Sequence, residues 1–359
     1  MKVLVAMSGG VDSSVAASVL ADDGHDVVGV TMRLWGGPSD TGCCSASEVS
    51  DARRAAAQLG VDHHVFDYSE EFERFVVDPY VADHAVGRTP NPCIECNRHL
   101  KFDLLVERAD LLGFDAVATG HHARLVGAPG ARRIARGADP AKDQSYVLHP
   151  IVDGDLDRVL FPIGHLTKAE VRDRATALGL RTASKPDSQD VCFITRADGR
   201  EAFLRERIEL HSSEVVDLDG GIVGRSEAVE LVTIGQRRGL GLAGGADRRF
   251  VLDVDVAGRT ITVGPPERLQ VDQLEVGAVR RASGVTAAML AGSDVWVQCS
   301  AHGEVRPAVV DPAIVEPATA QRLTLRWHVP QRRVAPGQSV VLYDSDGPGA
   351  LVLAGGLAT

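Results

Sequence analysis

Short apolar runs alternate with longer segments of helical periodicity in the first half of the chain. The apolar runs predict strands at 1–7, 26–34, 62–68 and 115–122. The periodic segments predict helices at 12–22, 45–60, 70–86, 98–112 and 167–178, and Ser45/Glu48 and Thr167/Glu170 have capping-box spacing. This alternation predicts an α/β fold, a doubly wound parallel sheet with helices on both faces. Ligands of such sheets bind beyond the carboxyl ends of the strands.

The hydrophobic pattern changes near residue 206, where the helical period gives way to short alternating runs. The segment 249–266 predicts a β-hairpin with its turn at Ala257-Gly258. From about residue 274 the alternating runs repeat closely enough to predict a small antiparallel barrel. We therefore expect a catalytic α/β domain at 1–205, a small β-rich central domain at 206–270 and a C-terminal β-barrel at 274–357.

A glycine turn joins the first predicted strand to the first predicted helix. Ser8, Gly9 and Gly10 form the turn, and Asp12 with two serines opens the helix. The backbone N–H groups and the dipole of a helix N-terminus make such a turn an anion-binding site. The common nucleotide-binding signature has a lysine here that reaches the terminal phosphates, and this turn has none. The turn therefore predicts a phosphate site of a different type.

Length and composition limit the kinds of protein to consider. The chain has 359 residues, of which 44% are hydrophobic and 24% charged, which is typical of a soluble protein with two or three domains. No apolar run is long enough to span a bilayer, and a core strand begins at the first residues, so we expect no signal peptide and a cytoplasmic location. The net charge of −11 argues against nucleic-acid binding through bulk charge, although local patches still allow recognition.

Two cysteine-containing segments are candidates for reactive chemistry. Cys93 and Cys96 lie in "RTPNPCIECNRHLKFDLL", and a helix is expected to begin just after Cys96, which with Arg98 and Lys101 nearby favours the thiolate form. Cys192 lies in "SKPDSQDVCFI". In the cytoplasm such cysteines are reactive, metal-binding or buried thiols rather than structural disulfides. The C-x-x-C alone is compatible with redox, metal-binding and structural roles, whereas Cys192 alone is best interpreted as a small buried residue before Phe193 and Ile194.

Several motifs together resemble a known family. The glycine turn resembles the pyrophosphate loop of ATP-pyrophosphatases, whose adenine nucleotide alpha hydrolase-like fold cuts ATP between the α and β phosphates. The chain also contains "TPNPCIECN", "ATGHHAR", "KDQSYVL", "DSQDVCFI", "TIGQRRGLG" and "PGQSVVLYD" in that order. In this combination, which extends over essentially the whole chain, the sequence resembles the bacterial tRNA-specific 2-thiouridylases.

The resemblance implies an ATP-dependent enzyme that converts uridine to 2-thiouridine at the wobble position of tRNA. Such an enzyme adenylates the uridine C2 oxygen, with Mg²⁺ neutralising phosphate charge, because AMP leaves far more readily than a carbonyl oxygen. Asp12 is then a catalytic residue. The residues implied to bind ATP are Ala6, Met7, Ser8, Gly9, Gly10, Val11, Asp12, Ser13, Met32 and Gly120.

The same resemblance implies a sulfur relay and a tRNA site. Cys192 would carry a persulfide received from a donor such as a cysteine desulfurase or relay protein, Cys96 would act as nucleophile, and a Cys96–Cys192 disulfide would remain. The uridine would be flipped out, and the barrel would clamp the anticodon arm. The residues implied to contact tRNA are Asn91, Pro92, Cys93, His121, Lys142, Asp143, Gln144 and Gln338.

The sequence departs from the family at Cys93, where many members have an aspartate. Cys93, Cys96 and Cys192 form a three-cysteine set, and related sulfur-inserting enzymes use three cysteines to hold a [4Fe–4S] cluster. The alternatives are therefore a persulfide relay with a spare thiol, which we favour, then a cluster, and last a zinc ion on the same three thiols. Cys43, Cys44 and Cys299 are interpreted as structural or spare.

Two other function classes share the phosphate turn. An ATP-dependent synthetase or amidotransferase would need an ammonia source, and the sequence has no glutaminase domain. A non-enzymatic adenine-nucleotide sensor would not need the paired thiol segments. Both classes are therefore disfavoured.

Overall fold

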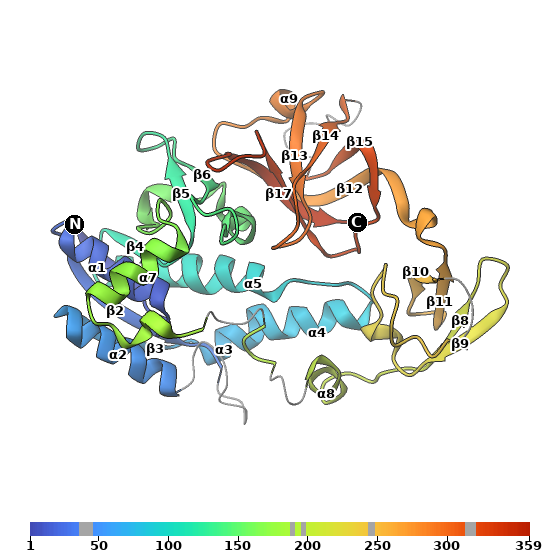
Figure 1. Cartoon of the computed structure of the whole chain (residues 1–359), viewed down its shortest axis with the longest axis horizontal. Helices are drawn as coiled ribbons and strands as arrows, with labels where there is room; N and C mark the ends of the chain where they lie inside the picture. The colour runs from blue at the N-terminus through green and yellow to red at the C-terminus, as the bar shows by residue number, and fades with distance from the viewer. Residues whose placement is uncertain (36–45, 187–190, 195–198, 243–247, 313–320) are drawn as a thin grey trace.

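The chain folds into an α/β part, a small sheet and a barrel (Figure 1). The computed structural model describes residues 1–35, 46–186, 191–194, 199–242, 248–312 and 321–359. In Figure 1 the α/β part is blue to green, the small sheet yellow to orange, and the barrel orange to red. Among these residues, no helix combines the length and apolarity needed to cross a membrane.

The α/β part is built on a five-stranded parallel sheet in the order β3-β2-β1-β4-β7. The strands are β1 (Lys2–Ala6), β2 (Asp26–Arg33), β3 (Asp62–Asp67), β4 (Ala116–Thr119) and β7 (Val159–Leu160). The first four confirm the predicted strands. β7 was not predicted, because two residues are too few for a periodic signal. A separate hairpin, β5 (Ala123–Val126) with β6 (Arg133–Arg136), was also missed.

Helices cover both faces of this sheet, as the apolar runs require. Val3 and Val5 point into a core shared with α1 (Val11–Asp22), α2 (Ala46–Leu59) and α7 (Lys168–Ala177). Leu4 points to the other face, into a core that includes Phe72 and Leu105. Successive strand residues face opposite sides, so each face has its own core. The predicted doubly wound architecture is therefore confirmed.

The second face is covered by two long helical segments, each with π-helical turns in its interior. The first comprises α3 (Ser69–Phe72), η1 (Glu73–Val77) and α4 (Asp78–Ala85), close to the predicted helix at 70–86. The second comprises α5 (Pro92–Glu95), η2 (Cys96–Leu104) and α6 (Leu105–Leu111).

The second segment begins earlier than predicted. Asn91 caps it by accepting a hydrogen bond from the Cys93 N–H at 3.1 Å, and Pro92 occupies the first turn. The two prolines of "TPNP" favour an extended loop, but the fixed φ of proline also suits the first turn of a helix. The expectation that a helix begins just after Cys96 is therefore wrong.

The start of α7 confirms one of the two predicted capping boxes. Thr167 accepts a hydrogen bond from the Glu170 N–H at 3.3 Å, and its own N–H donates to the Glu170 carboxylate at 2.7 Å. Ser45, the first residue of the other predicted box, lies outside the described residues.

The small sheet has four strands in the order β10-β11-β8-β9. Its strands are β8 (Ser213–Val216), β9 (Ile222–Ser226), β10 (Phe250–Asp255) and β11 (Thr260–Gly264). β10 and β11 pair in antiparallel fashion, which confirms the predicted hairpin at 249–266. Short helical segments lie between the larger elements of the chain: η3 (Ser145–Ile151), η4 (Leu156–Arg158), η5 (Arg181–Ser184), α8 (Gly199–Arg205), η6 (Val229–Leu231), η7 (Pro266–Leu269) and α9 (Ala287–Leu290).

The C-terminal part is a closed antiparallel barrel, as predicted. Its strand order is β12-β15-β14-β13-β16-β17. The strands are β12 (Gln270–Arg281), β13 (Asp294–Gln298), β14 (Arg306–Val310), β15 (Leu323–Arg332), β16 (Ser339–Tyr343) and β17 (Val352–Ala358). The barrel packs on the α/β part, because Tyr146 lies in the core of the barrel and donates its hydroxyl to the Ser339 carbonyl at 2.8 Å. This packing brings barrel loops to the edge of the parallel sheet.

Candidate active site

A cavity of about 620 Å³ lies at the carboxyl ends of β1, β2 and β4. Met32 comes from the end of β2, and Gly120 directly follows β4. The barrel contributes Ser300, His302 and Gln338 to the wall of the same cavity. The ligand site is therefore at the edge that the sheet topology predicts.

Most of the residues predicted to bind ATP line this cavity. They are Ala6, Met7, Ser8, Asp12, Ser13, Met32 and Gly120. Of the remaining three described residues, Gly9 and Gly10 do not line it, and neither does Val11, whose side chain is buried in the core between the sheet and α1. Val11 can therefore reach a nucleotide only through its backbone.

The glycine turn is held in one shape by its own hydroxyl groups and by α2. Gly9 has a φ of +74°, and a Cβ there would lie 2.3 Å from the carbonyl oxygen of Glu48 in α2. Ser8 donates its N–H to the Ser13 hydroxyl at 3.2 Å, and the Ser14 hydroxyl donates to the Gly10 carbonyl at 2.9 Å. Only glycine has both the backbone freedom and the size for position 9. The loop that precedes α1 is thus preformed.

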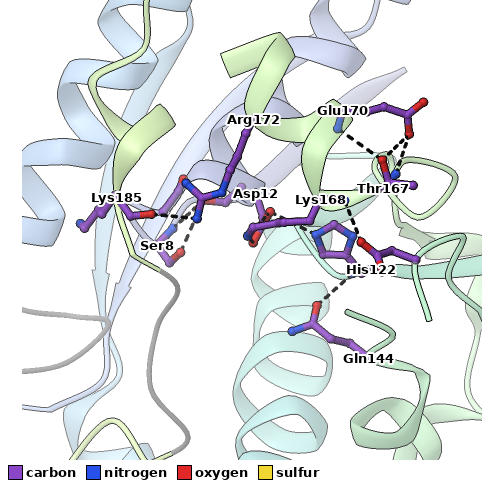
Figure 2. A network of polar contacts seen from close by, with 12 residues as sticks. Ser8, Asp12, His122, Gln144, Thr167, Lys168, Glu170, Arg172 and Lys185 are labelled. Carbon is purple, nitrogen blue, oxygen red and sulfur yellow. Dashed lines mark hydrogen bonds and ion pairs between the residues drawn. The ribbon is translucent and has the colours of Figure 1, made fainter. Parts of the chain in front are cut away.

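Lys168 provides the positive charge that the turn lacks. Its ammonium lies 2.7 and 2.9 Å from the two carboxylate oxygens of Asp12 (Figure 2). Lys168 is the first residue of α7 and is 9% exposed. His122 approaches the same carboxylate, with Nε2 3.1 Å from an oxygen of Asp12. Burial alone would raise the pKa of Asp12, but the hydrogen bonds from His122 and Lys168 outweigh it, and the pKa is lowered.

The loop after β4 is clamped by Gln144. Its side-chain oxygen accepts the His122 N–H at 2.9 Å, and its own N–H donates to the His122 carbonyl, also at 2.9 Å (Figure 2). His121, the preceding residue, is buried and has Nδ1 2.7 Å from the Thr119 hydroxyl. Burial holds the pKa of His121 well below its ordinary value. His121 therefore faces the cavity as a neutral imidazole.

Three of the cysteines line the same cavity, although Cys192 is far from the others in the sequence. Cys93 lies in the first turn of α5, and Cys96 follows in the next turn, 8% exposed. Cys192 enters the cavity beside Phe193, whose ring packs against Phe72 and Tyr80 in an aromatic cluster. A covalent relay needs its thiols in one site, and this arrangement meets that requirement.

All residues predicted to contact tRNA also line the cavity: Asn91, Pro92, Cys93, His121, Lys142, Asp143, Gln144 and Gln338. Asp143 differs from the others in that its carboxylate accepts several hydrogen bonds from neighbouring protein groups. It accepts the Gly137 N–H at 2.9 Å and the Ser145 N–H and hydroxyl at 3.1 and 2.8 Å. Arg136 lies 3.4 Å away as an ion-pair partner. The carboxylate of Asp143 therefore holds the loop that presents Lys142 and Gln144.

The described residues contain no group of three or more His, Cys, Asp or Glu side chains placed to hold a metal ion. Among the described residues the three cysteines therefore do not form a site for a single zinc ion. Cys43 and Cys44 lie outside the described residues. Burial raises the pKa of the Cys299 thiol to about 12, which is consistent with a structural role.

Sequence reasoning missed several residues of this site. Lys168 was passed over although both residues of its capping box were identified, because the contact with Asp12 joins residues 156 positions apart. His122 lies within the quoted "ATGHHAR" but was assigned no role. Ser300, Ala301 and His302 reach the cavity only because the barrel packs on the α/β part.

Comparisons with known proteins agree with this architecture. Family models match residues 1–196 (tRNA methyl transferase HUP domain), 201–265 (tRNA methyl transferase PRC-barrel domain) and 296–357 (aminomethyltransferase beta-barrel domain). A solved 4-thiouridine synthetase bound to RNA and ATP aligns with 53% of this chain and 44% of its own at 20% identity and a TM-score of 0.36, too low to add to the assignment.

Curated relatives match over nearly the full length. The tRNA-specific 2-thiouridylase MnmA of Roseiflexus sp. (strain RS-1) is 44% identical over 378 residues, covering 99% of this chain and 98% of the relative. The protein of the same name from Mycobacteroides abscessus is 43% identical over 367 residues, covering 100% and 99%. Identity at this level over both whole chains, together with a phosphate loop and two cysteine segments in one cavity, shows that this chain belongs to the tRNA-specific 2-thiouridylase family.

Proposed function

We propose that this protein catalyses the ATP-dependent 2-thiolation of uridine at the wobble position of tRNA. The observation that carries the proposal is one cavity lined by Ser8, Asp12 and Ser13 from the phosphate loop and the start of α1 together with Cys96 and Cys192. Activation and sulfur transfer both take place at C2 of the same uridine. The groups that perform the two steps must therefore line the same cavity. The names of the full-length relatives support the choice of tRNA uridine as substrate.

In the first step the C2 oxygen of uridine attacks the α-phosphorus of ATP. The bond from that phosphorus to the bridging oxygen breaks, and pyrophosphate leaves with the electron pair. The turn at Gly9 and Gly10 and the start of α1 hold the phosphates through backbone N–H groups. Lys168 lies beside them, and we propose that its ammonium stabilises the charge that develops on the departing pyrophosphate. Asp12 orients Lys168 for this role.

Mg²⁺ is proposed to enter with the phosphates of ATP rather than to occupy a site of its own. Both carboxylate oxygens of Asp12 are already bonded to Lys168. The described residues offer no cluster of carboxylates that would replace this contact. Bound with ATP, Mg²⁺ would neutralise phosphate charge, and Asp12 would act on Lys168.

In the second step the terminal sulfur of a Cys192 persulfide attacks C2, and AMP leaves with the former carbonyl oxygen. The Cys96 thiolate then attacks the Cys192 sulfur, which breaks the sulfur–sulfur bond and leaves 2-thiouridine on the tRNA. The product disulfide between Cys96 and Cys192 is reduced by an external dithiol, and a sulfur donor such as a cysteine desulfurase or relay protein reloads Cys192. We propose this relay in preference to a cluster, because it needs only the two thiols of Cys96 and Cys192, and no step passes through iron.

The remaining parts of the chain are proposed to bind tRNA. The uridine must leave its stack to reach the buried cavity, so we expect base flipping next to Asn91, Cys93 and Gln144. The barrel, at 274–357, would clamp the anticodon arm, and the 206–270 part would link it to the catalytic part at 1–205. Since tRNA is the proposed substrate, we also propose a cytoplasmic location.

The test is nucleoside mass spectrometry of tRNA from cells that lack the protein. Loss of 2-thiouridine, restored by the wild-type gene, is expected. Unchanged 2-thiouridine, with ATP cleavage that depends on ammonia rather than on tRNA, would instead identify a synthetase.

A further inference from the structure

We propose that Arg136 is a positioning residue that fixes a loop of the α/β part and a loop of the barrel relative to each other in the wall of the cavity. The two loops are 142–144 and 300–302, and both line the cavity. Arg136, which the structure describes as the last residue of β6, is not itself a lining residue. The inference rests on the proposed function, because it takes tRNA as the ligand that the two loops receive.

Arg136 lies where the hairpin of β5 and β6 docks on the barrel (Figure 1). Its N–H donates to the Ala350 carbonyl at 2.9 Å. Its guanidinium donates to the Asp346 carbonyl at 3.2 Å, and the guanidinium carbon lies 4.6 Å from the centre of the Tyr343 ring, in a cation–π contact. The barrel therefore holds both the main chain and the side chain of Arg136.

Asp143 connects Arg136 to loop 142–144. Arg136 Nε lies 3.4 Å from the Asp143 carboxylate, and the two side chains are 14% and 6% exposed. The same carboxylate accepts the Ser145 hydroxyl at 2.8 Å, and that hydroxyl lies 3.0 Å from the Tyr343 hydroxyl. Water and salt screen such a sheltered ion pair only weakly. The position of loop 142–144 is therefore fixed relative to the barrel.

Gln298 connects Arg136 to loop 300–302. This residue ends β13 and is 3% exposed. Its amide oxygen accepts from the Arg136 guanidinium at 2.7 Å. Its amide nitrogen donates to the carbonyls of Ser300 and Ala301 at 2.9 and 3.3 Å. A guanidinium has only donors, so Arg136 must face the amide oxygen, which directs the amide N–H groups toward the loop. Arg136 thus orients the side chain that holds loop 300–302.

One planar guanidinium therefore joins the two loops. Its N–H groups form a rigid fork, so contacts with Asp143 and Gln298 fix the direction of both partners as well as their distance. The cavity has to receive the uridine in register with the phosphate loop and the thiols, and a misplacement of about 1 Å in a reactive site can cost about 10²-fold in rate. None of these contacts involves the phosphate loop, so we expect Arg136 to affect the use of tRNA and not the binding of ATP.

The experiment measures steady-state pyrophosphate release by the full-length protein with tRNA, a persulfide donor and a dithiol. The concentrations of tRNA and ATP are varied separately. In Arg136→Met and in Gln298→Met, kcat/KM for tRNA should fall by about tenfold or more, as expected for a misplaced site, while KM for ATP stays at the wild-type value. Gln298→Met leaves the pair of Arg136 and Asp143 in place, so it keeps the test decisive if Arg136→Met folds poorly.

Arg280→Met is the matched control. Arg280 in β12 donates to the Asp153 carboxylate at 3.1 and 3.2 Å, and this partly exposed ion pair also joins the barrel to the α/β part. The variant loses the same charge as Arg136→Met and a link between the same two parts, and it should keep the wild-type kcat/KM for tRNA. Gln298→Met changes no charge, so its loss cannot come from weaker attraction of the tRNA phosphates.

The proposal is overturned if Arg136→Met, correctly folded, or Gln298→Met keeps the wild-type kcat/KM for tRNA, because the two loops would then not depend on one joint. It is also overturned if Arg280→Met shows the same loss or if KM for ATP rises in parallel, because general loosening of the barrel would then explain the result. If the wild type forms no 2-thiouridine, the proposed function itself fails. If the wild type forms it and the variants equal the wild type, only the positioning role fails.

Discussion

Lys168 forms a two-pronged ion pair with Asp12, its ammonium 2.7 and 2.9 Å from the two carboxylate oxygens, across 156 positions of sequence. The pair joins the first turn of α7 to the first turn of α1. It places a lysine beside a phosphate loop whose own sequence contains none. The helix start proposed to bind phosphate and the lysine beside it thus come from segments that are far apart in the sequence and adjacent in the structure.

Substitution of either member of this pair is expected to abolish activation of tRNA. Lys168→Met should lower the single-turnover rate of tRNA-dependent pyrophosphate release by about 10²-fold or more, the usual loss when one charge-stabilising donor is removed. Asp12→Ala should do the same while the protein remains folded, since Lys168 loses its orientation. Arg174→Met, on an exposed position of the same helix, is the control for charge alone. An unchanged release rate would remove Asp12 and Lys168 from the site.

The order of the two chemical steps is tested at Cys192. Sulfur enters only after adenylation, so Cys192→Ser should consume ATP in a tRNA-dependent manner and form no 2-thiouridine. AMP release and nucleoside mass spectrometry on the same reaction measure both steps. Normal thiolation by this variant would contradict the persulfide role of Cys192.

Substitutions of Cys93 distinguish a persulfide relay from an iron–sulfur cluster mechanism. In the relay only Cys96 and Cys192 react, so Cys93→Asp and Cys93→Ala should retain thiolation with a persulfide donor, in air and without added iron. Iron content of the purified protein is measured in parallel. If thiolation by Cys93→Ala falls to background while adenylation persists, and iron falls with it, Cys93 is a cluster ligand.

Gly120 is expected to tolerate no side chain. A Cβ at this position would lie 2.6 Å from the Ser13 nitrogen and 2.7 Å from the Asp12 carbonyl carbon. Gly120→Ala must therefore push the end of β4 away from the phosphate loop, at a cost of about 1–3 kcal/mol in the free energy of unfolding. Nucleotide affinity, measured by calorimetry, should fall. Gly347→Ala, where a Cβ meets nothing within 4 Å and the backbone does not have a positive φ, is the steric control. Wild-type affinity in Gly120→Ala would refute the close approach.

Acid is expected to loosen the contact between the barrel and the α/β part through His149. This buried imidazole has Nε2 3.2 Å from the Ser339 hydroxyl, and burial lowers its pKa from 6.5 to about 3. Because the unfolded state binds the proton first, stability is full above pH 6.5 and declines as pH falls toward 3. At pH 5 the loss from this group is about 2 kcal/mol.

The measurement is unfolding of the barrel at pH 7.5 and pH 5, followed by fluorescence of Trp296 and Trp327. His149→Gln is expected to be less stable at neutral pH but to lose less on acidification than the wild type. His165→Gln, on an exposed position, should keep the wild-type difference. An unchanged pH difference in His149→Gln would assign the acid sensitivity to other groups.

Local patterns in the sequence were enough to predict the arrangement of the chain into a parallel sheet and a barrel. Runs such as Val3–Met7 and the alternating segments after residue 274 predicted the parallel sheet and the barrel, because burial of strand faces is encoded residue by residue. The helix start at Pro92 was misplaced, since proline stops a helix from within but also suits its first turn. The strand β7 was not predicted, because two residues are too few to show a hydrophobic periodicity.

The sequence by itself determined the doubly wound fold, the phosphate turn and the two cysteine segments, since each is a signal carried by neighbouring residues. Only the tertiary structure decided which distant side chains complete the site. The Lys168 contact with Asp12, the Lys185 contact with Gly9 and the arrival of Ser300 and His302 join residues on separate elements. Such contacts depend on how the helices and the barrel dock on the sheet edge, and docking is set by packing of whole surfaces, which no local spacing records.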